Sequence, residues 1–135
     1  MNGIYKEKII DAYKNPKNFG SLEDADIVIE DFNPGCGDKF KIYMKFYGEN
    51  LKDIKFTGIG CVISTASASL LTEFVKNKNI NEIEKLETKD IIKLLGVELN
   101  PARIKCALLP LMIIKAGIKN YKTNFTRMSS TNLKE

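Results

Sequence analysis

The chain has 135 residues, of which 44% are hydrophobic and 28% are charged, and its formal net charge is +4. This length suits one domain, and the composition is that of an ordinary soluble globular protein. Acidic residues are interleaved with the lysines along the whole chain, which argues against nucleic-acid binding. No apolar run approaches the roughly 20 residues of a membrane-spanning helix. We therefore expect neither a nucleic acid nor a membrane as a partner.

The N-terminus and the cysteines indicate the compartment. The first residues contain no apolar secretory segment and no Arg-rich transit segment. The chain has three cysteines, and an odd number argues against a disulfide framework. We expect a cytoplasmic protein, and a mature organellar protein fits the same features.

The first half of the chain predicts one helix followed by three strands. Apolar residues recur at helical spacing from Ile4 to Tyr13, and Asn15-Pro16 ends this helix. Apolar and polar residues then alternate over residues 27–30, 40–46 and 54–56, which is typical of strands with one buried face. The residues 48–50 form the turn between the last two. The pattern predicts three antiparallel strands.

The second half predicts helices. Small residues fill positions 64–69, and an apolar stripe follows at Leu70, Leu71, Phe74 and Val75. A face of small residues allows this helix to approach a neighbouring element closely.

Residues that are typical of helix ends then divide the rest of the chain into three helices. Asn81 and Thr88 are candidate N-caps of two short helices, and Gly96 ends the second. Pro101 suits the first turn of a last helix, which we expect to run to about Tyr121.

Strands followed by helices indicate an α+β fold. We expect a single domain over residues 1–122, in which a three-stranded antiparallel sheet carries helices packed on one face. The polar residues 123–135 are predicted to form a flexible C-terminal tail.

The cysteines are the most informative residues, and no two of them form a CxxC pair. Cys36 lies between Gly35 and Gly37 in a loop between strands, where glycines leave room for a bulky ligand near the backbone. Asp38 follows two residues later, so both side chains can face the same space. Taken alone, this pattern also suits an ordinary turn with an incidental thiol.

The other two cysteines stand on helices. Cys61 follows Gly60 where the third strand gives way to a helix, and a helix N-terminus stabilises a thiolate. Cys106 lies in the last helix beside Lys105, whose charge has the same effect. Each cysteine alone would also suit a small buried residue. The three together, with Asp38 as a fourth donor, point to one shared metal or iron–sulfur site.

The chain contains no histidine, which narrows the chemistry further. A Cys–His nucleophile pair, a Ser–His–Asp triad and histidine metal ligands are all excluded. No glycine-rich phosphate-binding motif is present either. Metal or sulfur chemistry on cysteine and aspartate remains.

These residues resemble the IscU/NifU-type iron–sulfur cluster assembly scaffolds, including the related SufU branch. The similarity covers residues 5–121, nearly the whole domain. It rests on the stretch from Tyr5 to Gly20 and on four motifs: Pro34-Gly-Cys-Gly-Asp, Gly60-Cys61, Ser67-Ala-Ser-Leu-Leu-Thr-Glu73 and Arg103-Ile-Lys-Cys-Ala.

The resemblance implies a scaffold or carrier rather than an enzyme. Such a scaffold receives sulfur from a cysteine desulfurase, assembles a [2Fe-2S] cluster with iron and transfers it to apo iron–sulfur acceptor proteins. The implied ligands are Cys36, Asp38, Cys61 and Cys106, and zinc can occupy the same site. A homo-oligomer is compatible with this role.

The chain also departs from both branches. IscU members usually carry histidine before the last cysteine, whereas this chain has Lys105, as SufU members do. The segment between Cys61 and Cys106 is too short, however, for the insertion that SufU members carry there. The chaperone-binding segment Leu-Pro-Pro-Val-Lys of IscU is replaced by Leu99-Asn-Pro-Ala-Arg103, which puts chaperone-driven transfer in doubt. We expect Lys105 to pair with Asp38 or with a thiolate; the alternative is a solvated helix residue.

Two other functions fit the same residues. The first is a zinc-bound sulfurtransferase-like protein in which one cysteine accepts persulfide from a desulfurase. The second is a structural zinc domain that binds other proteins.

Pro110 lies four residues after Cys106 in the last helix. Proline has no N–H and its ring clashes with the carbonyl four residues earlier. We expect a kink or a local break there, which would give the Cys106 thiol freedom to reach the site.

Overall fold

The computed structural model describes residues 3–35 and 37–134, with side chains described for 6–35 and 37–124. The helices and strands, in chain order, are α1 (Gly3–Lys14), β1 (Ile27–Asn33), β2 (Asp38–Tyr47), β3 (Asn50–Ile59), α2 (Val62–Val75), α3 (Ile80–Glu84), α4 (Thr88–Leu95) and α5 (Pro101–Lys134). This order of strands before helices confirms the expected α+β fold.

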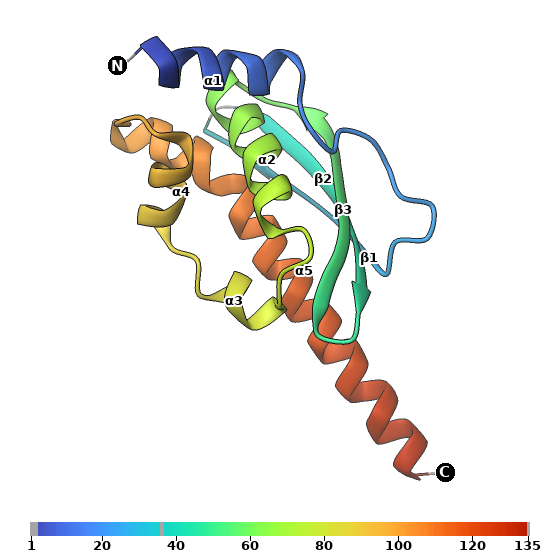
Figure 1. Cartoon of the computed structure of the whole chain (residues 1–135). Helices are drawn as coiled ribbons and strands as arrows, with labels where there is room; N and C mark the ends of the chain where they lie inside the picture. Colours follow the sequence, from blue (N-terminus) through green and yellow to red (C-terminus); the bar gives the residue numbers. More distant parts are fainter. Residues whose placement is uncertain (1–2, 36, 135) are drawn as a thin grey trace.

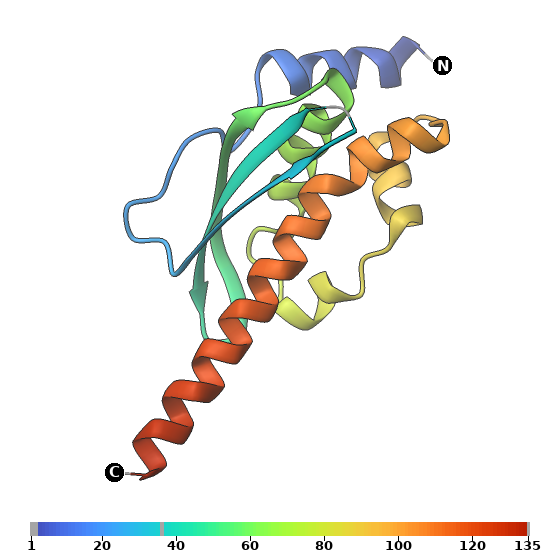
Figure 2. The same cartoon turned by 180° about the vertical axis from the view of Figure 1, so that it is seen from behind.

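The three strands form one antiparallel sheet in the order β1-β2-β3. Alternate residues of β2 are buried, as period-two patterning requires: Phe40, Ile42, Met44 and Phe46. The helices α2 and α5 cover this face, with α5 against β1 and β2, and α2 against β3 (Figures 1 and 2). The expected packing of helices on one face of the sheet is therefore confirmed.

Helix α2 occupies the centre of the helical layer, where it contacts α1, α4 and α5. Its small residues make this close packing feasible, because Ala66, Ser67 and Ala68 are fully buried. The expected apolar stripe is only partly buried: Leu71 and Val75 lie in the core, whereas the side chain of Phe74 is 43% exposed.

Two expected N-caps are wrong. Helix α3 is capped by Asn79, whose side chain accepts a hydrogen bond from the backbone N–H of Asn81. Helix α4 is capped by Glu87, which forms a capping box with Asp90. Asn81 and Thr88 lie inside these helices because the neighbouring residues supply the caps. Gly96 at the end of α4 and Pro101 at the start of α5 are placed as expected.

Helix α5 differs from expectation in two ways. It continues to Lys134 instead of ending near Tyr121, and its C-terminal part projects beyond the sheet (Figure 1). It also continues through Pro110, so a local break is wrong. Its first turns, drawn in orange in Figure 2, run in a different direction from the rest, so the helix bends without breaking.

None of the helices in the described part of the chain combines the length and the apolar character needed to cross a membrane.

Gly58 allows β3 to approach β2 closely at the end of the sheet that leads to Cys61. Its φ is 146°, and a Cβ there would lie 2.2 Å from the carbonyl oxygen of Lys39. Gly48, in the hairpin between β2 and β3, also has a positive φ of 60°, but a Cβ there would meet no atom within 4 Å.

We expect Gly58→Ala to lower the free energy of unfolding by about 3 kcal/mol, because a strained backbone region costs about 1–3 kcal/mol and overpacking costs a similar amount. Gly48→Ala should cost about 1 kcal/mol, from its backbone conformation alone. Urea unfolding followed by circular dichroism measures both. Equal losses in the two variants would contradict the close approach at Gly58.

Candidate metal centre

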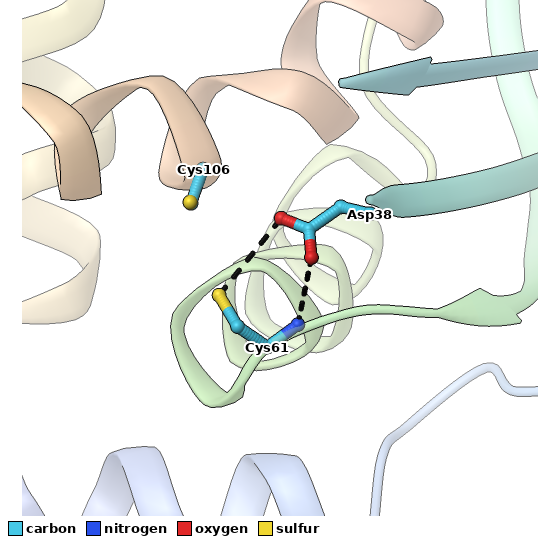
Figure 3. Close-up of side chains that lie close together, drawn as sticks. All are labelled: Asp38, Cys61 and Cys106. Carbon is cyan, nitrogen blue, oxygen red and sulfur yellow. Dashed lines mark hydrogen bonds between the residues drawn. The ribbon is translucent and has the colours of Figure 1, made fainter. Parts of the chain in front are cut away.

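Three of the four expected site residues meet at one end of the molecule, although they come from different elements. Asp38 is the first residue of β2, Cys61 immediately precedes α2, and Cys106 lies in the second turn of α5. Their ligand atoms all lie within 4.8 Å of one another (Figure 3). Cys36 lies outside the described residues, so its place in the group stays a prediction.

Asp38 holds the turn that carries Cys61. Its side chain is only 2% exposed, and its Oδ1 accepts a hydrogen bond from the backbone N–H of Cys61 at 2.9 Å. The Cys61 Sγ lies 3.9 Å from Oδ2 of the same carboxylate (Figure 3). The carboxylate is thus fixed by the backbone of one cysteine and faces its thiol.

Cys61 is the N-cap residue of α2. Its Sγ accepts a hydrogen bond from the backbone N–H of Ser64 at 3.4 Å and lies 3.5 Å from the Ser64 hydroxyl oxygen. This confirms the expected position at the junction of strand and helix. The residue is half-buried, in contrast to a fully buried core cysteine.

Gly60 explains why a glycine precedes Cys61. A Cβ at this position would lie 2.6 Å from the ring of Phe40 and 2.4 Å from the Ser64 hydroxyl oxygen. The backbone can therefore pass between the sheet and the first turn of α2 only without a side chain. Sequence reasoning placed Ser64 on the small packing face and missed its contact with the Cys61 sulfur.

Cys106 is buried, with 5% of its surface exposed, and it approaches the other two residues from α5 (Figure 3). The neighbouring residues Lys105 and Arg103 are exposed. The expected pairing of Lys105 with Asp38 or a thiolate stays a prediction.

The donor set suits a thiophilic metal. Two sulfur atoms and a carboxylate oxygen are ligands that Zn²⁺ and iron both accept. With Zn–S bonds near 2.3 Å, tetrahedral ligand sulfurs lie about 3.8 Å apart. The group within 4.8 Å is close to this spacing, so small side-chain movements would suffice to surround a metal ion.

The sequence and the fold place the chain in one known class of domain. A family model described as the NifU-like N terminal domain matches residues 4–128. The chain belongs to this family.

Relatives from two branches match the chain equally well. It is 38% identical to the zinc-dependent sulfurtransferase SufU of Bacillus subtilis, over 87% of this chain and 91% of that protein. It is 39% identical to the iron–sulfur cluster assembly scaffold protein IscU of Escherichia coli K12, over 88% of this chain and 94% of that protein.

A solved structure agrees with the fold. The chain matches FiSufU, a SUF-system protein of Fervidobacterium islandicum AW-1, with a TM-score of 0.75 and 32% identity over 85% of this chain and 96% of that one.

The bond between Asp38 and the Cys61 N–H predicts a stability effect in the metal-free protein. Asp38→Ala removes the acceptor from a part-buried donor, which should lower the free energy of unfolding by about 1–3 kcal/mol. Asp38→Asn keeps an acceptor oxygen and should cost less. Urea unfolding in the presence of a chelator measures both variants. Equal losses would mean that the carboxylate does not hold the turn through this bond.

Proposed function

We propose that the protein is a scaffold that assembles [2Fe-2S] clusters from iron and desulfurase-derived sulfur and transfers them to apo acceptor proteins. The observation that carries the proposal is the convergence of Asp38, Cys61 and Cys106 at one end of a NifU-like domain. The IscU scaffold of E. coli, at 39% identity, supports it.

We infer that Cys36 completes the ligand set. Each iron of a [2Fe-2S] cluster takes two protein ligands besides the two bridging sulfides, so the cluster needs four donors. Asp38, Cys61 and Cys106 supply three, and Cys36 precedes Asp38 by two residues in a glycine-flanked segment. The same four residues form an S₃O set for zinc.

The cysteine desulfurase and the apo acceptor proteins are the partners that this role requires, and the cytoplasm remains the expected compartment. The protein acts here as a carrier, because the desulfurase supplies the sulfur and the chain's own residues bind it. Of the two cysteines that the structure describes, half-buried Cys61 is better placed to accept incoming sulfur than buried Cys106.

The second candidate is a zinc-bound persulfide acceptor. The SufU of B. subtilis, a zinc-dependent sulfurtransferase, supports it at 38% identity. The Lys105-Cys106 pair and the half-buried Cys61 fit this role as well. A purely structural zinc domain fits less well, because such sites are closed and Cys61 is half-buried.

One experiment separates these functions. The protein is incubated anaerobically with ferrous iron, cysteine, a cysteine desulfurase and a thiol reductant, which supplies the electrons that turn persulfide sulfur into sulfide. Visible absorption then reports the cluster, and transfer is followed with an apo-ferredoxin. Cluster formation and transfer support the scaffold. A zinc-loaded protein that gains a persulfide but no cluster supports the second candidate.

The ligand assignment predicts the behaviour of cysteine variants in this assay. Cys36→Ala, Cys61→Ala and Cys106→Ala should each abolish stable cluster formation, because no other cysteine is present to replace the lost bond. Tyr47→Ala is a matched control, since Tyr47 lies at the opposite end of β2 and is 76% exposed. A wild-type yield in any cysteine variant would remove that residue from the site.

Asp38 is expected to be the labile ligand. A carboxylate oxygen is a harder and weaker ligand for iron than a thiolate. Asp38→Ala should therefore retain the cluster longer and transfer it several-fold more slowly to apo-ferredoxin. Asp38→Asn is the comparison variant that keeps the side-chain size. Faster release from Asp38→Ala would contradict the labile role.

A further inference from the structure

A buried hydrogen bond ties α2 to α5 beside Cys106. The Ser67 hydroxyl, fully buried in α2, donates to the carbonyl oxygen of Ala107 at 2.6 Å. The two residues are 40 positions apart in sequence, and Ala107 directly follows Cys106. A backbone carbonyl has two lone pairs, so it can accept this bond beside one from its own helix, and the bond then links the two helices directly.

Pro110 changes the hydrogen bonding of this turn of α5. It has no N–H, so it cannot donate to the carbonyl of Cys106, four residues earlier, and a proline ring bends the helix at that turn. Side-chain hydrogen bonds from a neighbouring helix can support a proline-bent turn. The Ser67 hydroxyl bonds the carbonyl of Ala107, the next residue of the same turn, and so ties the bent turn to α2.

The same helix also holds Cys61. Ser64 contacts the Cys61 sulfur at the N-terminus of α2, and Ser67 follows one turn later. Two serines of α2 therefore connect to the two cysteine-bearing segments. A rigid helix between them fixes the separation of the two thiols.

We propose that Ser67 is a positioning residue of the metal centre, holding the bent turn of α5 so that Cys106 faces Asp38 and Cys61. The proposal rests on the proposed ligand set, and it adds a residue that does not itself touch the metal. Outer-shell partners of this kind commonly change metal affinity 10–100-fold.

A simpler alternative is that Ser67 only fills space and satisfies a carbonyl. Ser69 is the matched control for this alternative. It lies on the same helix, is 1% exposed, and its hydroxyl accepts a hydrogen bond from the Lys17 backbone N–H at 2.8 Å. Ser69→Ala therefore removes a buried hydroxyl of α2 that contacts the segment after α1 instead of α5.

The first test uses Co²⁺ alone as the probe, in wild type, Ser67→Ala and Ser69→Ala. Ser67→Ala should weaken Co²⁺ binding about tenfold and change the thiolate-to-cobalt and ligand-field bands, because the Cys106 sulfur is displaced. Ser69→Ala should keep the wild-type spectrum, even where it loses as much stability to urea. Equal affinity and identical spectra in wild type and Ser67→Ala would overturn the proposal.

Pro110→Ala provides a second arm. An alanine restores the N–H donor to the Cys106 carbonyl and removes the ring that bends the turn, so the position of this turn should rely less on Ser67. The loss of Co²⁺ affinity caused by Ser67→Ala should therefore shrink in the Pro110→Ala background. An undiminished loss would show that Ser67 does not compensate for the proline, and would overturn that part of the argument.

Thiol alkylation of the metal-free, reduced protein keeps the test independent of the proposed function. Iodoacetamide labelling is followed for each cysteine separately by peptide mass spectrometry. Ser67→Ala should raise the labelling rate of buried Cys106 several-fold over Ser69→Ala and leave Cys61 nearly unchanged. Failure of wild type to bind Co²⁺ or Zn²⁺ would refute the metal centre, whereas an unchanged Cys106 labelling rate would refute the role of Ser67.

Discussion

The close packing of other elements around α2, which its small residues allow, is the constraint on which the rest of the structure depends. Ala66, Ser67 and Ala68 have no exposed surface, and α1, α4 and α5 all contact this helix. Larger side chains at these positions would push the surrounding helices outward, since cores are close-packed. The position of α2 in turn fixes where its N-terminus meets the sheet. Cys61 stands at that point, so the packing of a helix determines the location of a thiol.

The spacing of apolar residues and the residues that begin and end helices were sufficient to predict most of the fold. Alternation along β2, Gly96 with a φ of 74° and Pro101 at the start of α5 are local signals that the folded chain obeys. The N-caps were missed because several polar residues compete within one turn. Asn79 and Glu87 cap their helices, and the choice depends on which neighbour completes the hydrogen bonds.

Long-range effects were harder to predict. The chain after Tyr121 contains no glycine or proline to stop a helix, so the polar sequence continues as α5. A proline inside a helix normally breaks or kinks it, yet α5 continues through Pro110, and α2 packs against α5 and donates the Ser67 bond to the turn before it. For the site, the sequence predicted the three cysteines and Asp38; the structure brings Asp38, Cys61 and Cys106 together, and Cys36 stays a prediction. The bond from the Cys61 N–H to Asp38 depends on tertiary packing and left no local signal, whereas the contact of Ser64 with Cys61 is the local N-cap contact of α2.

The two oxygens of Asp38 have different surroundings, which bears on how a carrier can be loaded and emptied. Oδ1 accepts the Cys61 N–H, whereas Oδ2 faces the Cys61 sulfur (Figure 3). Metal-binding carboxylates are commonly held by hydrogen bonds of this kind. One oxygen can therefore maintain the turn while the other serves as a weak ligand. Because the bond between Oδ1 and the Cys61 N–H involves protein atoms alone, release of a cargo from Oδ2 would leave that bond intact. Such an arrangement would let the Cys61 turn accept the next cargo without refolding, which suits the proposed carrier role better than a structural zinc domain, where the metal itself stabilises the fold.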